Sequence, residues 1–180
     1  MAIHKIIFMD VDGPLIPLRM HKNTGYGLVQ YDYHDDNVLK WDPNVIATLN
    51  EHCPPQNIRI VFNTAHNGNE GINEVRNCAI RNGLHCNLIH PIHKTRFPDS
   101  IDGRVTAIYD WLHRNIKDDD KCRWVVADDY ELNVPDHQIK VDLASGLSDT
   151  QLVEMFTRLM HEESTTFYGE RAAWHTNQVK

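Results

Sequence analysis

Three short apolar runs, each followed at once by polar residues, set the strongest limit on how this chain can fold. They are Lys5–Met9, Ile58–Phe62 and Trp124–Ala127, and they consist mainly of branched and aromatic side chains. Their apolar residues follow one another without alternation, which is typical of strands buried on both faces of a parallel sheet. Helices must therefore cover both faces of the predicted sheet.

Helical patterns separate these strand candidates. One helix is predicted to begin at Asp42-Pro43. Two more short strands are predicted, at Leu88-Ile89 and at Ile139–Val141. Three further helices are expected over Gly71–Asn82, Ile101–Asn115 and Ser148–His161. Because parallel strands need crossover helices, the pattern predicts an α/β fold, a Rossmann-like parallel sheet with helices on both faces. We expect one domain over residues 1–162 and a peripheral tail over residues 163–180.

The net charge, the apolar runs and the cysteine pattern limit the kinds of protein that this chain can be. The formal net charge of −7 argues against a large nucleic-acid footprint, although it leaves room for a small basic groove in an acidic shell. The longest apolar runs fall far short of the ~20 residues of a spanning helix. The four cysteines form no CxxC pair, which is typical of reduced thiols. We therefore expect a cytoplasmic location.

Polar residues follow three of the predicted strands. They are Asp10–Gly13, Asn63-Thr64 and Asp128-Asp129. The carboxyl ends of parallel strands meet at one edge of the sheet, so four carboxylates should converge there. Such carboxylates repel one another, and a divalent cation usually offsets the repulsion. Since all the ligands are oxygens, magnesium is favoured over zinc.

The spacing of the two carboxylates after the first predicted strand indicates that they can act on the same substrate. Residues i and i+2 of an extended segment point to the same side, so Asp10 and Asp12 can both face a substrate. One carboxylate can attack while the other exchanges a proton with the leaving group. Gly13 then lets the chain turn away.

A family resemblance rests on several segments. Phe8–Leu15 (FMDVDGPL) resembles the first motif of the haloacid-dehalogenase-like (HAD) superfamily of phosphatases. The wider pattern is similar to the small HAD domains grouped with Swiss Army Knife RNA-repair proteins, which also occur as stand-alone bacterial and phage proteins. The matching segments, in order, are Asp10–Pro17, Trp41–Pro43, Arg59–Asn67, Gly103–Leu112, Trp124–Asp129 and Ile139–Leu152.

The resemblance implies a role for each matching residue. Asp10 is the expected nucleophile, forming an aspartyl-phosphate, and is also a metal ligand. Asp12 is the expected general acid and base, with its backbone carbonyl on the metal. Thr64 is expected to hydrogen-bond the transferring phosphoryl group. Asp128 is expected to bind Mg²⁺, with Asp129 supporting the ion directly or through water.

The chain departs from the family pattern at two positions. The basic residue of the superfamily, often Lys, falls on Arg104, for which Lys94 is the rival. Arg can contact phosphate with two nitrogens but presents a different geometry from Lys. Pro14 stands where Thr commonly follows the DxDG motif, which removes a hydroxyl and a backbone donor. Beside Thr64, Asn63 is a further candidate for binding the substrate.

The resulting interpretation is a magnesium-dependent phosphomonoester hydrolase with a minimal cap or none, because residues 15–40 and 65–100 are too short for a second core. A nucleotide or nucleic-acid terminal phosphate is the first substrate candidate, on the RNA-repair kinship alone. The alternatives are a phosphatase of a small metabolite or phosphoprotein, and a catalytically silent HAD-like binding or regulatory module. The sequence leaves the oligomeric state open.

Two further features of the sequence each allow more than one interpretation. Tyr26–Asp36 is rich in Tyr and His, and either lines a substrate mouth or forms a polar surface hairpin. A group of soft potential ligands suggests zinc, but its spacing matches no common zinc motif. Its members are His85, Cys86, His90 and His93.

Overall fold

The computed structural model describes residues 3–18, 41–64, 72–95, 101–117 and 120–161. The Tyr26–Asp36 segment, the tail 163–180 and much of the two segments weighed as a cap lie outside these residues. The interpretations made for them, and the domain boundary at residue 162, stay predictions.

Five parallel strands form one sheet, as the sequence predicted. They are β1 (Ile3–Met9), β2 (Ile58–Phe62), β3 (Ile89–Lys94), β4 (Lys121–Asp128) and β5 (Gln138–Lys140). Their order across the sheet is β3-β2-β1-β4-β5, and each neighbouring pair is parallel. The first strand of the chain is therefore the central one.

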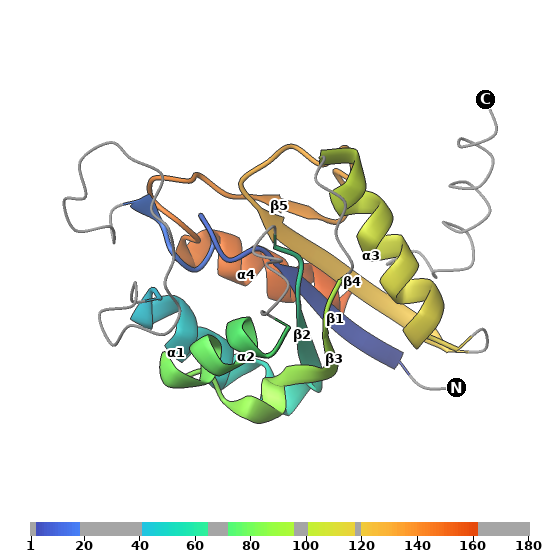
Figure 1. Ribbon diagram of the computed structural model, residues 1–180, viewed down its shortest axis with the longest axis horizontal. Coiled ribbons are helices and arrows are strands. Elements are labelled where there is room, and N and C mark those ends of the chain that lie inside the picture. Colours follow the sequence, from blue (N-terminus) through green and yellow to red (C-terminus); the bar gives the residue numbers. More distant parts are fainter. Residues whose placement is uncertain (1–2, 19–40, 65–71, 96–100, 118–119, 162–180) are drawn as a thin grey trace.

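Helices cover both faces of the sheet (Figure 1). The described helices are α1 (Pro43–His52), α2 (Ile72–Arg81), α3 (Ile101–Asn115) and α4 (Asp149–Met160), with short 3₁₀ turns η2 (Pro54–Gln56) and η3 (Cys86–Leu88). Buried residues of α1, α2 and α4 pack against one face, and those of α3 pack against the other. This arrangement confirms the α/β, Rossmann-like fold. None of the described helices is long and apolar enough to cross a membrane.

Side chains that start the helices have the expected capping roles. Asp42 accepts a hydrogen bond from the backbone N–H of Asn44 at the start of α1, where Pro43 occupies the first helical position. Ser148 and Gln151 form a capping box at the start of α4. These bonds satisfy amide groups that no helix can satisfy internally.

The core alternates between the two faces along each strand. Ile7 and Met9 of β1 belong to the cluster under α1, α2 and α4, whereas Ile6 and Phe8 belong to the cluster under α3. Because both faces are buried, the strands show no polar alternation in sequence. The ring of Phe8 meets two buried tryptophans edge-on, and these are Trp111 and Trp124.

Four strands differ from their predicted bounds. β1 begins two residues earlier than predicted, at Ile3, and β5 is shifted by one residue, to Gln138–Lys140. The third was expected as the short pair Leu88-Ile89 and is instead the six-residue β3. The fourth was expected over Trp124–Ala127 and begins three residues earlier, at Lys121. None of these differences changes the order of the sheet.

Candidate active site

Three strand ends meet at the carboxyl edge of the sheet. The backbone N–H of Asp10 donates to the carbonyl of Ala127 at 3.0 Å, and that of Asn63 donates to the carbonyl of Met9 at 2.9 Å. These bonds continue the parallel ladders one residue past the strands. Asp10 therefore lies between Asn63, after β2, and Asp128, at the end of β4.

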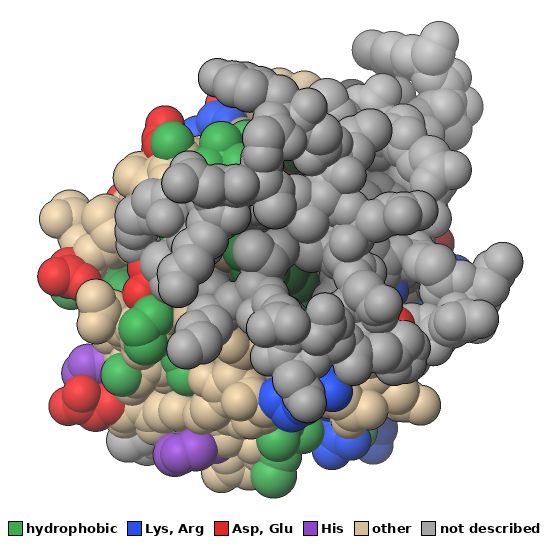
Figure 2. Space-filling view, turned by 60° about the vertical axis from the view of Figure 1, so that its left-hand side comes forward, with side chains coloured by type: hydrophobic (Ala, Val, Ile, Leu, Met, Phe, Trp, Pro, Cys, Tyr) green, Lys and Arg blue, Asp and Glu red, His purple; other side chains and the backbone are tan. Residues whose placement is uncertain are grey.

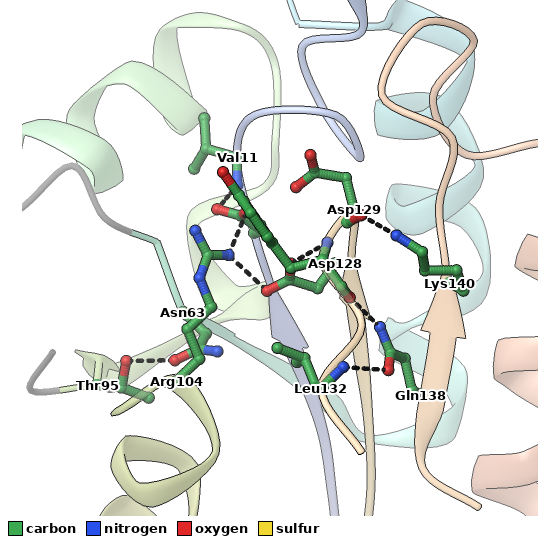
Figure 3. Close-up of polar contacts among 11 residues, drawn as sticks. Val11, Asn63, Thr95, Arg104, Asp128, Asp129, Leu132, Gln138 and Lys140 are labelled. Atoms are coloured by element: carbon green, nitrogen blue, oxygen red, sulfur yellow. Dashed lines mark hydrogen bonds and ion pairs between the residues drawn. The ribbon is translucent and has the colours of Figure 1, made fainter. Parts of the chain in front are cut away.

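Arg104 links two of the carboxylates. It lies in the first turn of α3, and its Nη1 donates to Oδ2 of Asp10 at 2.7 Å and to Oδ2 of Asp128 at 2.6 Å (Figure 3). All three side chains are buried, with exposed fractions of 7% for Arg104, 2% for Asp10 and 0% for Asp128. The ring of Tyr130 faces the guanidinium, with 4.7 Å between Cζ and the ring centroid.

The buried charges are not balanced. Burial, together with the neighbouring Asp128 carboxylate, raises the pKa of Asp10 to about 8, although Arg104 opposes this rise. Burial also raises the pKa of Asp128, again against the influence of Arg104. Burial works against the charged guanidinium, but Asp10 and Asp128 hold the pKa of Arg104 above its ordinary value. The guanidinium of Arg104 thus faces two carboxylates, so the site can carry more negative than positive charge.

The donor set fits a magnesium ion. Ligand oxygens of Asp10, Asp128 and Asp129 all lie within 4.8 Å of one another. Among the described residues, Oδ1 of Asp129 is buried and has no hydrogen-bond partner, so a cation there would satisfy it. Carboxylate oxygens are the ligands that Mg²⁺ prefers. These three side chains are the ones that would hold the ion.

Backbone and side-chain contacts orient these carboxylates. Oδ1 of Asp10 accepts from the N–H of Val11 at 2.8 Å, and Oδ1 of Asp128 accepts from the N–H of Tyr130 at 2.8 Å. The ammonium of Lys140 donates to the backbone carbonyl of Asp129 (Figure 3). Each ligand is therefore fixed by a contact outside the metal site, as in most metal centres.

Gln138 supports the same loop from β5. Its Oε1 accepts from the N–H of Leu132 at 2.9 Å, and its Nε2 donates to the carbonyl of Tyr130. Sequence reasoning missed Tyr130, Gln138 and Lys140. The N–H of Tyr130, two residues after Asp128, fits a local Asx-turn pattern. The other two contacts depend on how β5 aligns with β4, for which the sequence holds no signal.

The loop after β1 holds Asp12 beside the metal ligands. Burial raises the pKa of Asp129, and the nearby Asp12 carboxylate adds to this increase. Gly13 has a φ of 80°, and a Cβ there would lie 3.0 Å from Cβ of Asp129. The turn and the close approach both require glycine at this position. Asp12 thus lies at the site, and its role as general acid and base stays a prediction.

Asn63 and Thr64 are buried at the end of β2, next to Asp10. Their exposed fractions are 0% and 1%. Oγ1 of Thr95, which follows β3, donates to Oδ1 of Asn63 at 2.8 Å. Among the described residues, Nδ2 of Asn63 has no hydrogen-bond partner. Thr95 therefore fixes the amide of Asn63, a contact for which the sequence contains no signal.

The two rival basic residues occupy different places. Arg104 contacts both Asp10 and Asp128, as described above. Lys94 is buried at the end of β3, two strands away from β1. Burial lowers the pKa of Lys94, and the charge of Glu74 on α2 counteracts this. The geometry thus favours Arg104 over Lys94 as the basic residue of the site.

The zinc hypothesis finds no support in the described part of the chain. Within it, the only group of three or more potential ligands close enough to share an ion is the Asp10, Asp128 and Asp129 cluster. A cavity of about 1020 Å³ lies between α1 and α4, but its surface is mainly apolar, with Leu152 and Phe156 in its lining, and no carboxylate of the cluster lines it. We therefore assign the chemistry to the carboxylate cluster, which is the place of convergent charge.

Comparison with known families agrees with this geometry. No curated protein and no solved structure shows significant similarity to the chain. Residues 6–152 match the family described as the HAD domain in Swiss Army Knife RNA repair proteins, and this range includes every candidate residue of the site. Membership of that family supports a HAD-type hydrolase. The chain belongs to the HAD domains of Swiss Army Knife RNA repair proteins.

Proposed function

We propose that the protein is a magnesium-dependent phosphomonoester hydrolase that forms an aspartyl-phosphate on Asp10. One observation carries this proposal: the buried carboxylates of Asp10 and Asp128 share the single guanidinium of Arg104. A third carboxylate, Asp129, lies within ligand distance of the other two. A divalent cation is the natural complement to this excess of negative charge.

The residues support a two-step reaction. In the first step, a carboxylate oxygen of Asp10 attacks phosphorus, and the bond from phosphorus to the leaving oxygen breaks while Asp12 donates a proton to that oxygen. In the second step, Asp12 takes a proton from a water molecule whose oxygen attacks the same phosphorus. The bond between phosphorus and Asp10 then breaks, which releases inorganic phosphate, restores the Asp10 carboxylate and leaves Asp12 protonated as at the start.

Three side chains are the proposed ligands of the phosphoryl group. Thr64 and Asn63 follow the strand beside Asp10, and the guanidinium of Arg104 already lies against the attacking carboxylate. A guanidinium has five N–H donors in a planar fork, which suits phosphate oxygens. When bound, magnesium would neutralise charge on those oxygens. Positioning and charge neutralisation supply most of the catalysis in phosphoryl transfer.

A nucleotide or nucleic-acid terminal phosphate is the substrate that we propose first. Its support is the family description, which names RNA repair proteins. This is an argument by association, because HAD folds carry many activities. We also propose a cytoplasmic location, because Cys53, Cys78, Cys86 and Cys122 are all free thiols.

The test is phosphate release from an aryl phosphate with and without added Mg²⁺, followed by a panel of substrates. The panel contains phosphorylated metabolites, phosphopeptides, mononucleotides, and oligonucleotides with 3′- or 5′-phosphates. Asp10→Asn keeps the shape of the side chain but removes the attacking charge, so turnover should fall at least about a thousandfold. Thermal denaturation of both proteins checks that the variant is folded.

Each result leads to a distinct conclusion. Retention of more than about a tenth of the rate by Asp10→Asn rejects the covalent mechanism. Preference for a metabolite or a phosphopeptide keeps the mechanism but replaces the proposed substrate. Absence of turnover on every member of the panel, with magnesium bound, favours a catalytically silent binding module.

A further inference from the structure

A second polar cavity lies along the exposed edge of the sheet, away from the carboxylates. Its volume is about 550 Å³, and it lies beside the edge strand β3. The residues that line it are Arg59, Asn73, Arg76, Cys86, Asn87, Ile89, Pro91 and His93. They include two guanidinium groups and two amides but no carboxylate. The cavity is therefore locally cationic in a chain with a net charge of −7.

Neither arginine is neutralised by the part of the chain that the structure describes. No ion pair joins Arg59 or Arg76 to a carboxylate there, and Arg59 donates instead to the carbonyl of Ile58 at 3.3 Å. Glu74 is close in sequence, but its charge acts on Lys94. Figure 2 shows Lys and Arg atoms gathered toward the lower right of the described surface, and several Asp and Glu atoms toward the left.

The register of the strands places this cavity relative to Asp10. Lys94 pairs with Phe62, which pairs with Met9. His93, at one end of the cavity, is therefore level with Phe8, two residues short of Asp10 and two strands away, or about 12 Å at the usual strand spacing and rise. From His93 the lining runs back along β3 to Ile89, a further distance of about 13 Å. At roughly 3.4 Å per stacked nucleotide, the cavity begins about three to four nucleotides from the site.

We propose that this cavity binds backbone phosphates of a nucleic-acid strand whose phosphorylated end lies at Asp10. The inference rests on the proposed function and names the substrate class as a polymer rather than a mononucleotide. Guanidinium groups bind phosphate with two parallel hydrogen bonds, and amides add neutral donors. Several such donors in one cavity beside β3 suit a chain of phosphates. A single small anion would contact only part of this length.

The test compares a ladder of phosphorylated oligonucleotides, from one to eight nucleotides, in wild type, Arg59→Gln and Arg76→Gln. The measured quantity is the ratio of kcat/KM for the octamer to kcat/KM for the mononucleotide. We expect this ratio to fall about fivefold to tenfold in each variant, through KM rather than kcat. The dependence of log KM on log salt should become shallower by about one per lost phosphate contact. Arg76→Lys should recover part of the ratio.

The matched control is Arg114→Gln, which removes an exposed arginine that pairs with Asp110 on α3. It lowers the net charge equally and should keep the wild-type ratio. If Arg114→Gln lowers the ratio as much as Arg76→Gln does, the effect is one of overall charge and the cavity proposal is wrong. An unchanged ratio in both Arg59→Gln and Arg76→Gln also overturns it.

Direct binding separates this inference from the proposed function. A labelled, phosphorylated octamer is titrated into Asp10→Asn, with and without Arg76→Gln, so that no turnover is needed. Weaker binding on addition of Arg76→Gln supports the cavity even if no phosphatase activity is found. Equal binding rejects the cavity while leaving activity on aryl phosphates, and therefore the proposed function, intact. Thermal denaturation of each variant excludes loss of folding as the cause.

Discussion

Arg104 reaches Asp10 and Asp128 with the same nitrogen atom, Nη1. A contact of this kind, in which one point of positive charge lies between two carboxylates, is one that a lysine ammonium can also make. The planar fork of arginine is therefore not needed for the bridge itself. It becomes important only if other nitrogens of the guanidinium bind the phosphoryl group.

Substitution at Arg104 distinguishes these uses. Arg104→Ala leaves two buried carboxylates without their cation, and kcat should fall about a hundredfold or more. Arg104→Lys keeps the bridging charge and should retain roughly a tenth of the activity or more. Steady-state rates on an aryl phosphate provide the measurement. If Arg104→Ala has wild-type rates while Lys94→Ala loses activity, the basic role belongs to Lys94.

Asp128 is a proposed magnesium ligand, and its carboxylate also raises the pKa of Asp10. Asp128→Ala should weaken Mg²⁺ binding at least about tenfold, as measured by calorimetric titration. Without metal, the same variant should melt at a higher temperature than wild type, because a repelling carboxylate has been removed. Asp110→Ala, at an exposed position on α3, is the control and should bind Mg²⁺ normally. Full activity of chelator-treated wild type would contradict the metal assignment.

At the scale of single elements, the loop after β1 shows how closely the backbone limits the site. Gly13→Ala combines a strained left-handed conformation, at φ 80°, with a Cβ only 3.0 Å from Cβ of Asp129. The strain should lower the free energy of unfolding by about 1–3 kcal/mol. Because Asp129 must move, Mg²⁺ affinity and turnover should also fall.

Gly83→Ala is the matched control for this change. Gly83 also has a left-handed backbone, at φ 94°, but a Cβ there would meet only Ile46, at 3.8 Å. We expect a similar loss in denaturant stability with unchanged Mg²⁺ binding and turnover. If the two alanine variants have equal activity, the close approach between Gly13 and Asp129 does not matter for the site.

The elements that were mispredicted share a physical cause. β3 contains Pro91 and three polar or charged residues, so it lacks the apolar sequence pattern of a buried strand. Proline is tolerated there because β3 is an edge strand, whose outward N–H groups have no ladder partner. β4 begins with Lys121, at an exposed end of the strand that needs no apolar residue. A buried strand can be predicted because it needs apolar side chains. An edge strand is held by backbone hydrogen bonds, which any residue except proline can form, so its sequence shows little pattern.

The candidate site could be predicted in part, for a related reason. Asp10, Asn63 and Asp128 directly follow or end buried strands, so their convergence follows from the parallel order of the sheet. Thr95 follows β3, an edge strand that was itself only partly predicted. The bond between Gln138 and the loop after β4 depends on strand register, which no local pattern specifies.

At the scale of the whole molecule, the buried carboxylates should make the metal-free protein less stable as pH rises. Asp10 has a pKa of about 8 in the folded state, against 3.8 as its ordinary value. The folded state therefore holds its proton more tightly than the unfolded state. This contribution to the free energy of unfolding is fully present below pH ~4 and is lost as the pH rises toward 8. The raised pKa values of Asp128 and Asp129 act in the same direction.

Asp10→Asn removes the titrating group and isolates its effect. In a chelator, the difference in Tm between the variant and wild type should grow by several degrees in favour of the variant between pH 5 and pH 8. Each kcal/mol corresponds to roughly 2–4 °C for a domain of this size. Saturating Mg²⁺ should remove most of this difference, since a bound cation favours the charged carboxylate. A pH-independent difference would show that Asp10 is ionised in both states.

The central position of β1 has a consequence for how the chain is made. Of the five strands, β1 leaves the ribosome first, but one of its two edges pairs with β4, which begins only at Lys121. At roughly 5–20 residues per second, the nascent chain carries that open edge for on the order of ten seconds. Ile7 of β1 and Val125 of β4 are both apolar and buried in the folded protein. They remain separated throughout that interval. Translation of β4 is therefore the moment at which the sheet can close, and chaperones that bind exposed strands should act before it.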